Sequence, residues 1–241
     1  NIRIDSRAEE VLRVTPRHND AINEEWISDK VRFNYDGYYQ QRIDPPYIKK
    51  NGKLEQSTWD EAFNSLKAKL KNSKPLALIG EYVDIETGYA INKFMSNFGK
   101  NNIECRTDNQ AALPALESYR FNTPIADIEN ADLIILVGAN PKIEAPIINH
   151  KIFKSYNSGA EIFNIGENII LNYPTNYLGN KLVELNNTNL IKKLKRSSNP
   201  ILIIGSAFLN QIKSSHTIKS IFSFAKKNKI LSVNKNNLNF L

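Results

Sequence analysis

The sequence predicts an α/β fold with a parallel sheet and helices on both faces, preceded by a small β-rich part. Three observations predict it. Short apolar runs of strand length recur in the second half of the chain, as at residues 133–137 and 201–204. Several of these runs are followed by stretches with the 3.6-residue periodicity of an amphipathic helix. The first 56 residues instead show short extended stretches separated by turn residues, which is typical of hairpins.

The chain is therefore predicted to divide into a small β-rich part, residues 1–56, and an α/β domain, residues 57–241. Two hairpins are expected in the small part. Extended stretches at residues 2–4 and 11–14 indicate the first. The second is indicated by residues 47–55, where an Asn-Gly turn separates two short extended runs.

The α/β domain is predicted to begin with a capped helix. Thr58 and Glu61 have the spacing of a capping box, in which the Thr58 hydroxyl accepts a hydrogen bond from the backbone N–H of Glu61. The elements expected after this helix alternate: strands at residues 76–79, 103–106, 133–137, 161–165 and 201–204, and helices near residues 85–98, 145–156, 186–198 and 214–226.

The composition is typical of a globular, soluble chain. Its 241 residues are 41% hydrophobic, which is enough to bury a core. No apolar run approaches the roughly 20 residues that span a bilayer, so no direct membrane insertion is expected. The net charge of +7 comes mostly from lysine. We interpret these lysines as scattered rather than gathered with arginines and stacking aromatics, so no nucleic-acid partner is expected.

The single cysteine, Cys105, limits the metal and redox chemistry of the chain. One thiol cannot form an intrachain disulfide, and an iron–sulfur cluster needs about four ligands. Cys105 is therefore expected to be a small buried hydrophobic residue. The three histidines, His18, His150 and His216, lack metal-ligand spacing and are expected on the surface or in packing contacts. No catalytic or metal-binding residue is predicted.

The loop after residues 133–137 is the candidate binding loop of the chain. This buried strand runs into Gly138, Asn140 and Pro141, and a helix is expected to start near Pro146. Ligands of open α/β sheets bind at the carboxyl ends of strands, where glycine permits close approach and helix N-termini favour phosphate. In the structural alternative, Gly138 makes a turn, Asn140 caps it and Pro146 starts the helix. Neither glycine motif of nucleotide-binding proteins is present.

Residues 24–39 contain the remaining polar and aromatic candidates. Glu24 and Glu25 are adjacent, so their side chains should point in different directions, and beside Trp26 they indicate a polar interface rather than a catalytic pair. Aromatic residues nearby are expected to pack between the small part and the α/β part rather than stack on bases. They are Phe33, Tyr35, Tyr38 and Tyr39.

The run from Ile22 to Phe33, with Tyr35-Asp36-Gly37 behind it, resembles a known family. It is similar to the molybdopterin-oxidoreductase-like domain of the largest iron–sulfur subunit (75 kDa type) of respiratory complex I, the proton-translocating NADH:ubiquinone oxidoreductase. The resemblance covers most of the chain and is strongest in residues 11–42 and 131–146. Thr58-Trp59-Asp60-Glu61-Ala62 is a further match.

The resemblance also implies where this chain departs from catalytic relatives. Those enzymes have a cluster-binding cysteine at the position of Ser28. A serine hydroxyl is a harder ligand than a thiolate and loses its proton far less readily, so no cluster is expected here. Lys30 matches a lysine between cluster and pterin, and without the cluster we expect it in a structural ion pair. Gly138, Asn140 and Pro141 then become a candidate remnant of a lost cofactor pocket.

The resemblance implies a non-catalytic structural segment of a longer subunit. Residues 1–56 would be the remnant of a cluster-binding domain and residues 57–241 an incomplete molybdopterin-oxidoreductase-like domain, with iron–sulfur clusters only in an upstream part. The expected partners are other subunits of the peripheral arm, contacted around Glu24, Glu25, Trp26 and Arg32. The expected location is the matrix side of the mitochondrial inner membrane, or alternatively the cytoplasmic side of a bacterial plasma membrane.

Two other functions remain open at this point. One is a working molybdopterin or tungstopterin oxidoreductase, in which Ser28 would take part in cofactor binding. The other is a nucleotide-binding regulatory module that uses the loop at residues 138–146. The lack of any cysteine near Ser28 disfavours the first, and the lack of a glycine-rich phosphate motif disfavours the second.

Overall fold

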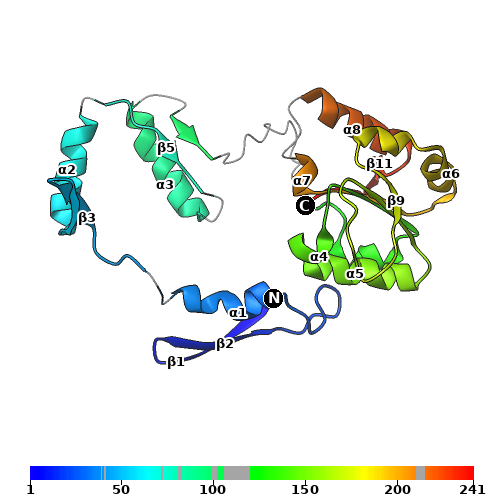
Figure 1. Ribbon diagram of the computed structural model, residues 1–241, viewed down its shortest axis with the longest axis horizontal. Helices are drawn as coiled ribbons and strands as arrows, with labels where there is room; N and C mark the ends of the chain where they lie inside the picture. The colour runs from blue at the N-terminus through cyan, green and yellow to red at the C-terminus, as the bar shows by residue number, and fades with distance from the viewer. Residues whose placement is uncertain are drawn as a thin grey trace. The chain divides into compact units, whose positions relative to one another are not determined.

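A computed structural model describes the chain as two compact units (Figure 1). The described residues are 1–38, 40, 42–71, 73–80, 83–98, 102–105, 120–209 and 215–241. Unit 1 joins Asn1–Tyr35 to Gln110–Leu241, and unit 2 is Asp36–Asn109. The predicted boundary between residues 56 and 57 lies within unit 2 and stays a prediction.

Unit 1 is built on a five-stranded parallel sheet with the order β13-β10-β7-β8-β9. The α/β fold predicted from the sequence is therefore confirmed. Three of the strands were predicted, and β9 and β13 were missed. The strands are β7 (Leu133–Val137), β8 (Glu161–Ile165), β9 (Asn176–Gly179), β10 (Pro200–Ile204) and β13 (Leu238–Phe240).

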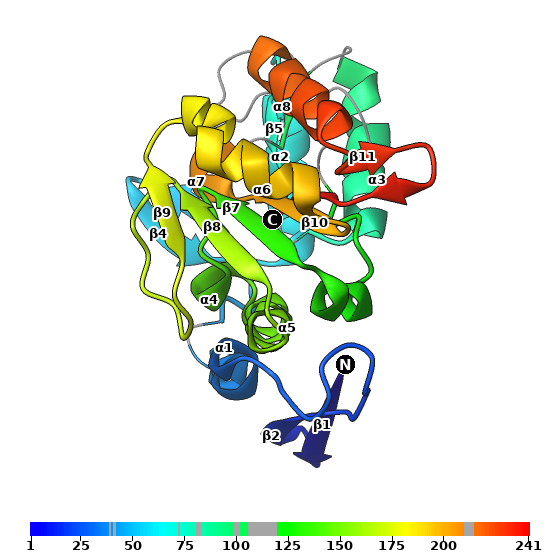
Figure 2. The same ribbon diagram turned by 90° about the vertical axis from the view of Figure 1, so that its right-hand side faces the viewer.

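Helices cover both faces of this sheet, as Figures 1 and 2 show. On one face lie α4 (Pro141–Glu144) and α5 (Pro146–Asn157), and on the other lie α6 (Thr188–Arg196) and α8 (Ser215–Lys227). Strand side chains alternate between the faces. Ile134 therefore packs in the core cluster that contains Ile152 of α5, whereas Ile135 packs in the cluster that contains Leu190 of α6 and Ile221 of α8.

Shorter elements complete this part of unit 1. They are η4 (Ile125–Asn130), η5 (Leu182–Asn186), α7 (Ser206–Leu209), β11 (Leu231–Ser232) and β12 (Lys235–Asn236). The side chain of His216, at the start of α8, lies outside the described residues. In the part of the chain that the structure describes, no helix has the length and apolar character needed to cross a bilayer.

The first 35 residues add the predicted hairpin to unit 1. β1 (Ile2–Arg7) pairs with β2 (Glu10–Pro16) in an antiparallel ladder. A compact loop then leads to α1 (Asp29–Phe33), which continues as η1 (Asn34–Tyr38). The Tyr35 hydroxyl donates to the Leu12 carbonyl at 3.0 Å and ties η1 to β2. Phe33 is 65% exposed, so its predicted packing role is wrong. Tyr39 and the Tyr38 side chain lie outside the described residues.

Unit 2 contains the second predicted hairpin and the capped helix. Thr58 Oγ1 accepts from the backbone N–H of Glu61 at 3.3 Å, which confirms the predicted N-cap. The Glu61 carboxylate accepts from the Ser57 hydroxyl at 2.6 Å, and this hydrogen bond, together with one from the backbone of Thr58, lowers the pKa of Glu61. The elements of unit 2 are β3 (Tyr47–Lys50), β4 (Lys53–Gln56), α2 (Trp59–Leu70), β5 (Ala77–Leu78), α3 (Ile85–Met95), η2 (Ser96–Phe98) and β6 (Ile103–Glu104).

Two sequence expectations are wrong in unit 2. The strands predicted at residues 76–79 and 103–106 pair only with each other, as the two-residue strands β5 and β6, and are not part of the main sheet. An apolar run identifies a strand but not its partner. Arg106, the last residue of the second predicted strand, lies outside the described residues. Cys105, predicted to be buried, is exposed because it directly follows this short ladder.

Candidate functional site

Ser28, at the position of the expected cluster cysteine, is the N-cap of α1. Its hydroxyl oxygen accepts a hydrogen bond from the backbone N–H of Val31 at 3.3 Å. The side chain therefore satisfies one of the free donors of a helix start. Lys30, in the same helix, is exposed and has no ion pair with a described residue, so the ion pair predicted for it is not found.

The loop before α1 places the carboxylate of Glu24 against α5. Asn19 and Glu24 form an isolated bridge, with N–H to carbonyl distances of 3.0 and 2.7 Å. The buried side chain of Asn23 donates to the carbonyls of Arg17 and Trp26 at 2.9 and 3.2 Å, which holds the loop together. Glu24 has a φ of 49°, a left-handed conformation that costs energy for a residue with a side chain. This conformation is held by the surrounding hydrogen bonds.

Glu24, Glu129, Lys151 and Lys154 form a four-charge network that joins this loop to η4 and α5. Lys151 is only 1% exposed, and its Nζ lies 2.5 Å from Glu129 Oε1 and 3.3 Å from Glu24 Oε1. Lys154 Nζ pairs with Glu24 Oε1 and lies 3.4 Å from Glu129 Oε1. A buried ammonium is costly unless it is paired, and the two carboxylates balance the two ammonium groups.

The network shifts the proton affinities of three of its members. The hydrogen bond from Lys154 lowers the pKa of Glu24 from 4.5 to about 2. The hydrogen bond from Lys151 lowers the pKa of Glu129, and the hydrogen bond to Glu24 raises the pKa of Lys154. The charged form of each group is thus favoured, which is the behaviour of a structural ion network rather than of a general acid or base poised near neutral pH.

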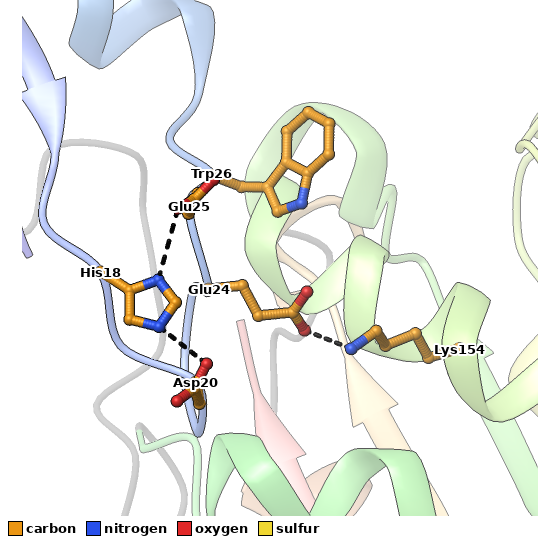
Figure 3. A pocket seen from close by; sticks show the side chains of 6 residues that line it. All are labelled: His18, Asp20, Glu24, Glu25, Trp26 and Lys154. Atoms are coloured by element: carbon orange, nitrogen blue, oxygen red, sulfur yellow. Dashed lines mark hydrogen bonds and ion pairs between the residues drawn. The ribbon is translucent and has the colours of Figure 1, made fainter.

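A pocket of about 550 Å³ opens beside this network, and Figure 3 shows the side chains that line it. Glu24 points toward Lys154, whereas Glu25 Oε1 lies 3.7 Å from His18 Nδ1, so the two adjacent carboxylates do point apart as expected. His18 Nε2 lies 2.8 Å from Asp20 Oδ1. His18 lies next to Asp20 and Glu25, and Glu24 pairs with Lys154, so the pocket contains no free nucleophile and base in contact among the described side chains.

Trp26 brings the loop against His150 of α5. Its ring centroid lies 5.7 Å from that of His150 on α5, at an interplanar angle of 44°. His150 Nε2 lies 3.6 Å from Glu24 Oε2, is buried and has no hydrogen-bond partner. No group of three or more His, Cys, Asp or Glu residues within the described ranges has an arrangement that could hold a metal ion. We call Glu24, Trp26, His150, Lys151 and Lys154 the junction cluster.

The candidate loop at Gly138 lies elsewhere in unit 1, at the carboxyl end of β7. Gly138 has a φ of 57°, and a Cβ there would lie 2.6 Å from Phe208 Cβ of α7. A Cβ on Gly205 would overlap the Cα of Ala139. Pro141 starts α4, while the side chain of Asn140 makes no capping hydrogen bond, so the predicted Asn140 cap is wrong. The backbone at Gly205 is therefore packed directly against the backbone at Gly138 and Ala139.

A glutamate occupies two hydrogen-bond donors at this loop, whereas the buried side-chain oxygen of Asn140 has no hydrogen-bond partner among the described residues. Glu144 Oε2 accepts from the backbone N–H of Asn140 at 2.6 Å, and Glu144 Oε1 accepts from the hydroxyl of Ser206. The cavity that remains is about 60 Å³, and its lining includes the carboxylates of Glu144 and Glu167. It has room for about two water molecules. Its two carboxylates would repel a phosphate group.

Comparisons with known proteins identify the family. A family model described as molybdopterin oxidoreductase matches residues 42–241. The chain belongs to the molybdopterin oxidoreductase family. A second model, described as the 4Fe-4S domain of NADH-ubiquinone oxidoreductase NDSU1/NuoG-like proteins, matches residues 1–36.

Curated relatives in the molybdopterin oxidoreductase family confirm the predicted resemblance. A NADH-quinone oxidoreductase subunit of Rickettsia bellii is 39% identical over 231 residues, covering 92% of this chain and 34% of that protein. The NADH-ubiquinone oxidoreductase 75 kDa subunit of Reclinomonas americana is 33% identical, covering 100% and 38%. The mitochondrial NADH dehydrogenase (ubiquinone) iron-sulfur protein 1 of Solanum tuberosum is 34% identical, covering 100% and 34%. The chain thus spans about a third of the length of these relatives.

The cavity beside Gly138 and the residues of the first 36 positions do not fit a pterin cofactor or a 4Fe-4S cluster. Binding pockets for organic cofactors usually measure about 300 to 1,000 Å³, far more than the cavity beside Gly138. A 4Fe-4S cluster is held by thiolates, and residues 1–36 contain no cysteine. The cavity beside Gly138 therefore has no room for a pterin, and residues 1–36 offer no thiolate for a cluster.

Sequence reasoning found Glu24 and Trp26 of the junction cluster and missed the three residues of α5. The sequence does contain a signal for one of them, Lys151. Lys151 lies on the stripe formed by Ile148, Ile152 and Ser155, where helical periodicity predicts burial. A lysine at such a position requires a counter-charge from elsewhere in the chain.

Proposed function

We propose that this chain is a structural segment of an iron–sulfur subunit of respiratory complex I, with no active site of its own. In this role it supports electron transfer from NADH to ubiquinone through clusters held outside the segment. The closed loop at Gly138 carries the proposal. Where a catalytic relative would receive a cofactor, the Glu144 carboxylate accepts from the backbone N–H of Asn140 and the hydroxyl of Ser206, and about 60 Å³ of space remains.

Residues 1–56 support the same proposal. Ser28 stands in for a cluster cysteine, and its hydroxyl acts as a helix cap. In this proposal residues 1–56 descend from a cluster-binding domain and residues 57–241 form part of a molybdopterin-oxidoreductase-like domain. Gly138, Asn140 and Pro141 are the remnant of a lost cofactor pocket. No residue of the chain is catalytic or holds a metal, and the clusters belong to an upstream part of the subunit.

The proposed partners are other subunits of the peripheral arm, with no nucleic acid and no direct membrane insertion. Exposed Trp26, beside Glu25 and Arg32, is the surface that we propose contacts a neighbouring domain or subunit. The proposed location is the matrix side of the mitochondrial inner membrane. The same role at the cytoplasmic side of a bacterial plasma membrane is the alternative, since relatives come from both sources.

The decisive experiment isolates the native assembly that contains this chain from detergent-solubilised membranes. NADH-ubiquinone reductase activity is assayed, and molybdenum and tungsten are measured by mass spectrometry. We expect the chain to co-migrate with the activity, with neither metal in stoichiometric amount. A separate enzyme with about one molybdenum or tungsten per chain would overturn the proposal and establish a working pterin oxidoreductase.

A second experiment tests the proposed contact at Trp26. The variant Trp26→Ala removes an exposed indole ring, and we expect a lower yield of the assembled complex on native gels because buried aromatic anchors contribute much of an interface. Trp26→Phe keeps a ring of similar character and is the matched control, with a yield close to the wild type. Normal yield of complex with Trp26→Ala would count against this surface.

The nucleotide-binding alternative predicts a different response. A dinucleotide that bound at Gly138 would perturb the amide resonances of Gly138 and Asn140 in a titration. The scaffold proposal predicts no saturable change there, because Glu144 already occupies the donors.

A further inference from the structure

The positive charge of the chain is concentrated at its C-terminal end. After Glu184 there is no aspartate or glutamate, whereas ten lysine and arginine residues follow up to Leu241. The formal net charge of the whole chain is +7, so the preceding residues sum to 7 − 10 = −3. The lysines are thus spread along the chain, but the acidic residues that balance them are missing from residues 185–241. A segment of such one-sided charge creates a positive potential over the elements that it forms.

The structure gathers part of this charge around a groove between α6 and α8. The groove measures about 340 Å³ and lies where the C-terminal ends of the two helices meet. Both helices lie on the sheet face opposite to α5, as Figure 2 shows. Apolar side chains that are buried or half-buried form the floor, and exposed lysines form the rim. The floor residues are Ile191, Leu194 and Phe224, and the rim residues are Lys195, Lys227 and Lys229.

The rim lysines are available to a partner. Lys193, which lies between them and the sheet, is already paired with Glu161 at 2.5 Å. Lys195, Lys227 and Lys229 have no ion pair with any described residue. Cations in the last turn of a helix are partly explained by the helix dipole. That explanation does not account for Lys229, which follows α8, or for the half-buried side chains of Ile191 and Phe224 that line the same groove.

We propose that this groove binds an acidic protein segment that inserts one or two apolar side chains. The rim would pair with carboxylates, and the floor would receive the apolar side chains. Lysine rather than arginine forms the rim, and the ring of Phe224 is half-buried in the floor instead of exposed for base stacking, which disfavours nucleic acid. The apolar residues lie in a concavity instead of protruding, which disfavours a lipid surface. The inference rests on this face alone and stands separately from the scaffold proposal.

The test uses the purified 241-residue chain and a fluorescein-labelled peptide rich in glutamate with one leucine and one phenylalanine. Anisotropy gives its Kd at low and at physiological salt. We expect saturable binding that weakens as salt rises, because the pairs are exposed at the rim. The triple variant K195E/K227E/K229E should raise the Kd by at least about tenfold, through loss of attraction and added repulsion. The neutral variant K195Q/K227Q/K229Q should give an intermediate Kd.

The matched control K142E/K192E/K219E reverses three exposed lysines that do not line the groove. It makes the same change in net charge, and we expect the Kd to change less than about twofold. Replacing leucine and phenylalanine of the peptide by serine should weaken binding to the wild type. An equal rise in Kd for K195E/K227E/K229E and K142E/K192E/K219E would overturn the proposal. The absence of saturable binding to the wild type would also overturn it. Tighter binding of single-stranded RNA or anionic vesicles through the rim lysines would overturn it in favour of another class of partner.

Discussion

At the residue scale, Lys151 makes the strongest prediction, since its side chain is 1% exposed and its ammonium contacts two carboxylates. Lys151→Ala removes a buried aliphatic stem and one charge of the junction cluster. We expect the free energy of unfolding of unit 1 to fall by about 2–4 kcal/mol. Lys151→Met keeps most of the volume of the stem and removes the same charge, so it should cost less than Lys151→Ala. Urea unfolding followed by Trp26 fluorescence, with Trp59 replaced by Phe, measures both. Equal costs for the two variants would contradict a packing role for the stem.

A second prediction at the residue scale concerns Glu24 and the loss of stability at low pH. Because its pKa falls from 4.5 to about 2 on folding, the ion pair stabilises the fold fully above pH 4.5. This contribution is lost as the pH falls from 4.5 to about 2. We expect Trp26 fluorescence in the Trp59→Phe background to report loosening of the loop over this window. Glu24→Gln should show a smaller acid change, with Glu129 providing what remains. An identical acid profile for Glu24→Gln would rule out Glu24 as the titrating group.

The sequence alone identifies Glu24 and Trp26 but not their partners. The Glu24 contact to Lys151 spans 127 residues, and the contact to Lys154 spans 130. Nothing local to either segment specifies which charge meets which. The same limit applies to Glu144, whose carboxylate meets Ser206 across 62 residues. A candidate loop can therefore be located from the sequence, whereas its closure by a side chain requires the fold.

At the element scale, the contact between the ends of β7 and β10 predicts a steric effect. A Cβ on Gly205 would overlap the Cα of Ala139 and the carbonyl oxygen of Gly138, and backbone atoms cannot move aside cheaply. We expect Gly205→Ala to lower the free energy of unfolding by about 3 kcal/mol or more. Gly80→Ala is the control, because nothing lies within 4 Å of its added Cβ. Thermal unfolding by circular dichroism compares them, and a mild effect at Gly205 would show that the strand ends separate easily.

Elements with a local sequence signal were predicted, whereas β13, which lacks one, was missed. The cap of α2 needs only Thr58 and Glu61, three residues apart, and it was found. β13 was missed because its asparagines indicate a loop. Its central residue, Asn239, is fully buried, and its side-chain oxygen accepts from the backbone N–H groups of Asn122 and Thr123, both at 2.8 Å. That buried strand depends on partners more than 100 residues away.

At the scale of the whole molecule, the two units differ in how much apolar surface they bury. Unit 1 contains two core clusters around its sheet. Among the described residues of unit 2, Met95 is the one fully buried hydrophobic side chain, while Trp59 and Phe63 of α2 are 61% and 58% exposed. Hydrophobic burial is the dominant favourable term in folding. Unit 2 alone should therefore be close to the limit of stability.

The chain is accordingly expected to unfold in two steps. Trp59 reports on unit 2 and Trp26 on unit 1, and these are the two tryptophans of the chain. In urea, the variant Trp26→Phe should show a low midpoint through Trp59, and Trp59→Phe a higher midpoint through Trp26. The slope of ΔG against urea should be smaller for the first transition, because less surface becomes exposed. Coincident midpoints and slopes would show instead that the units unfold as one cooperative body.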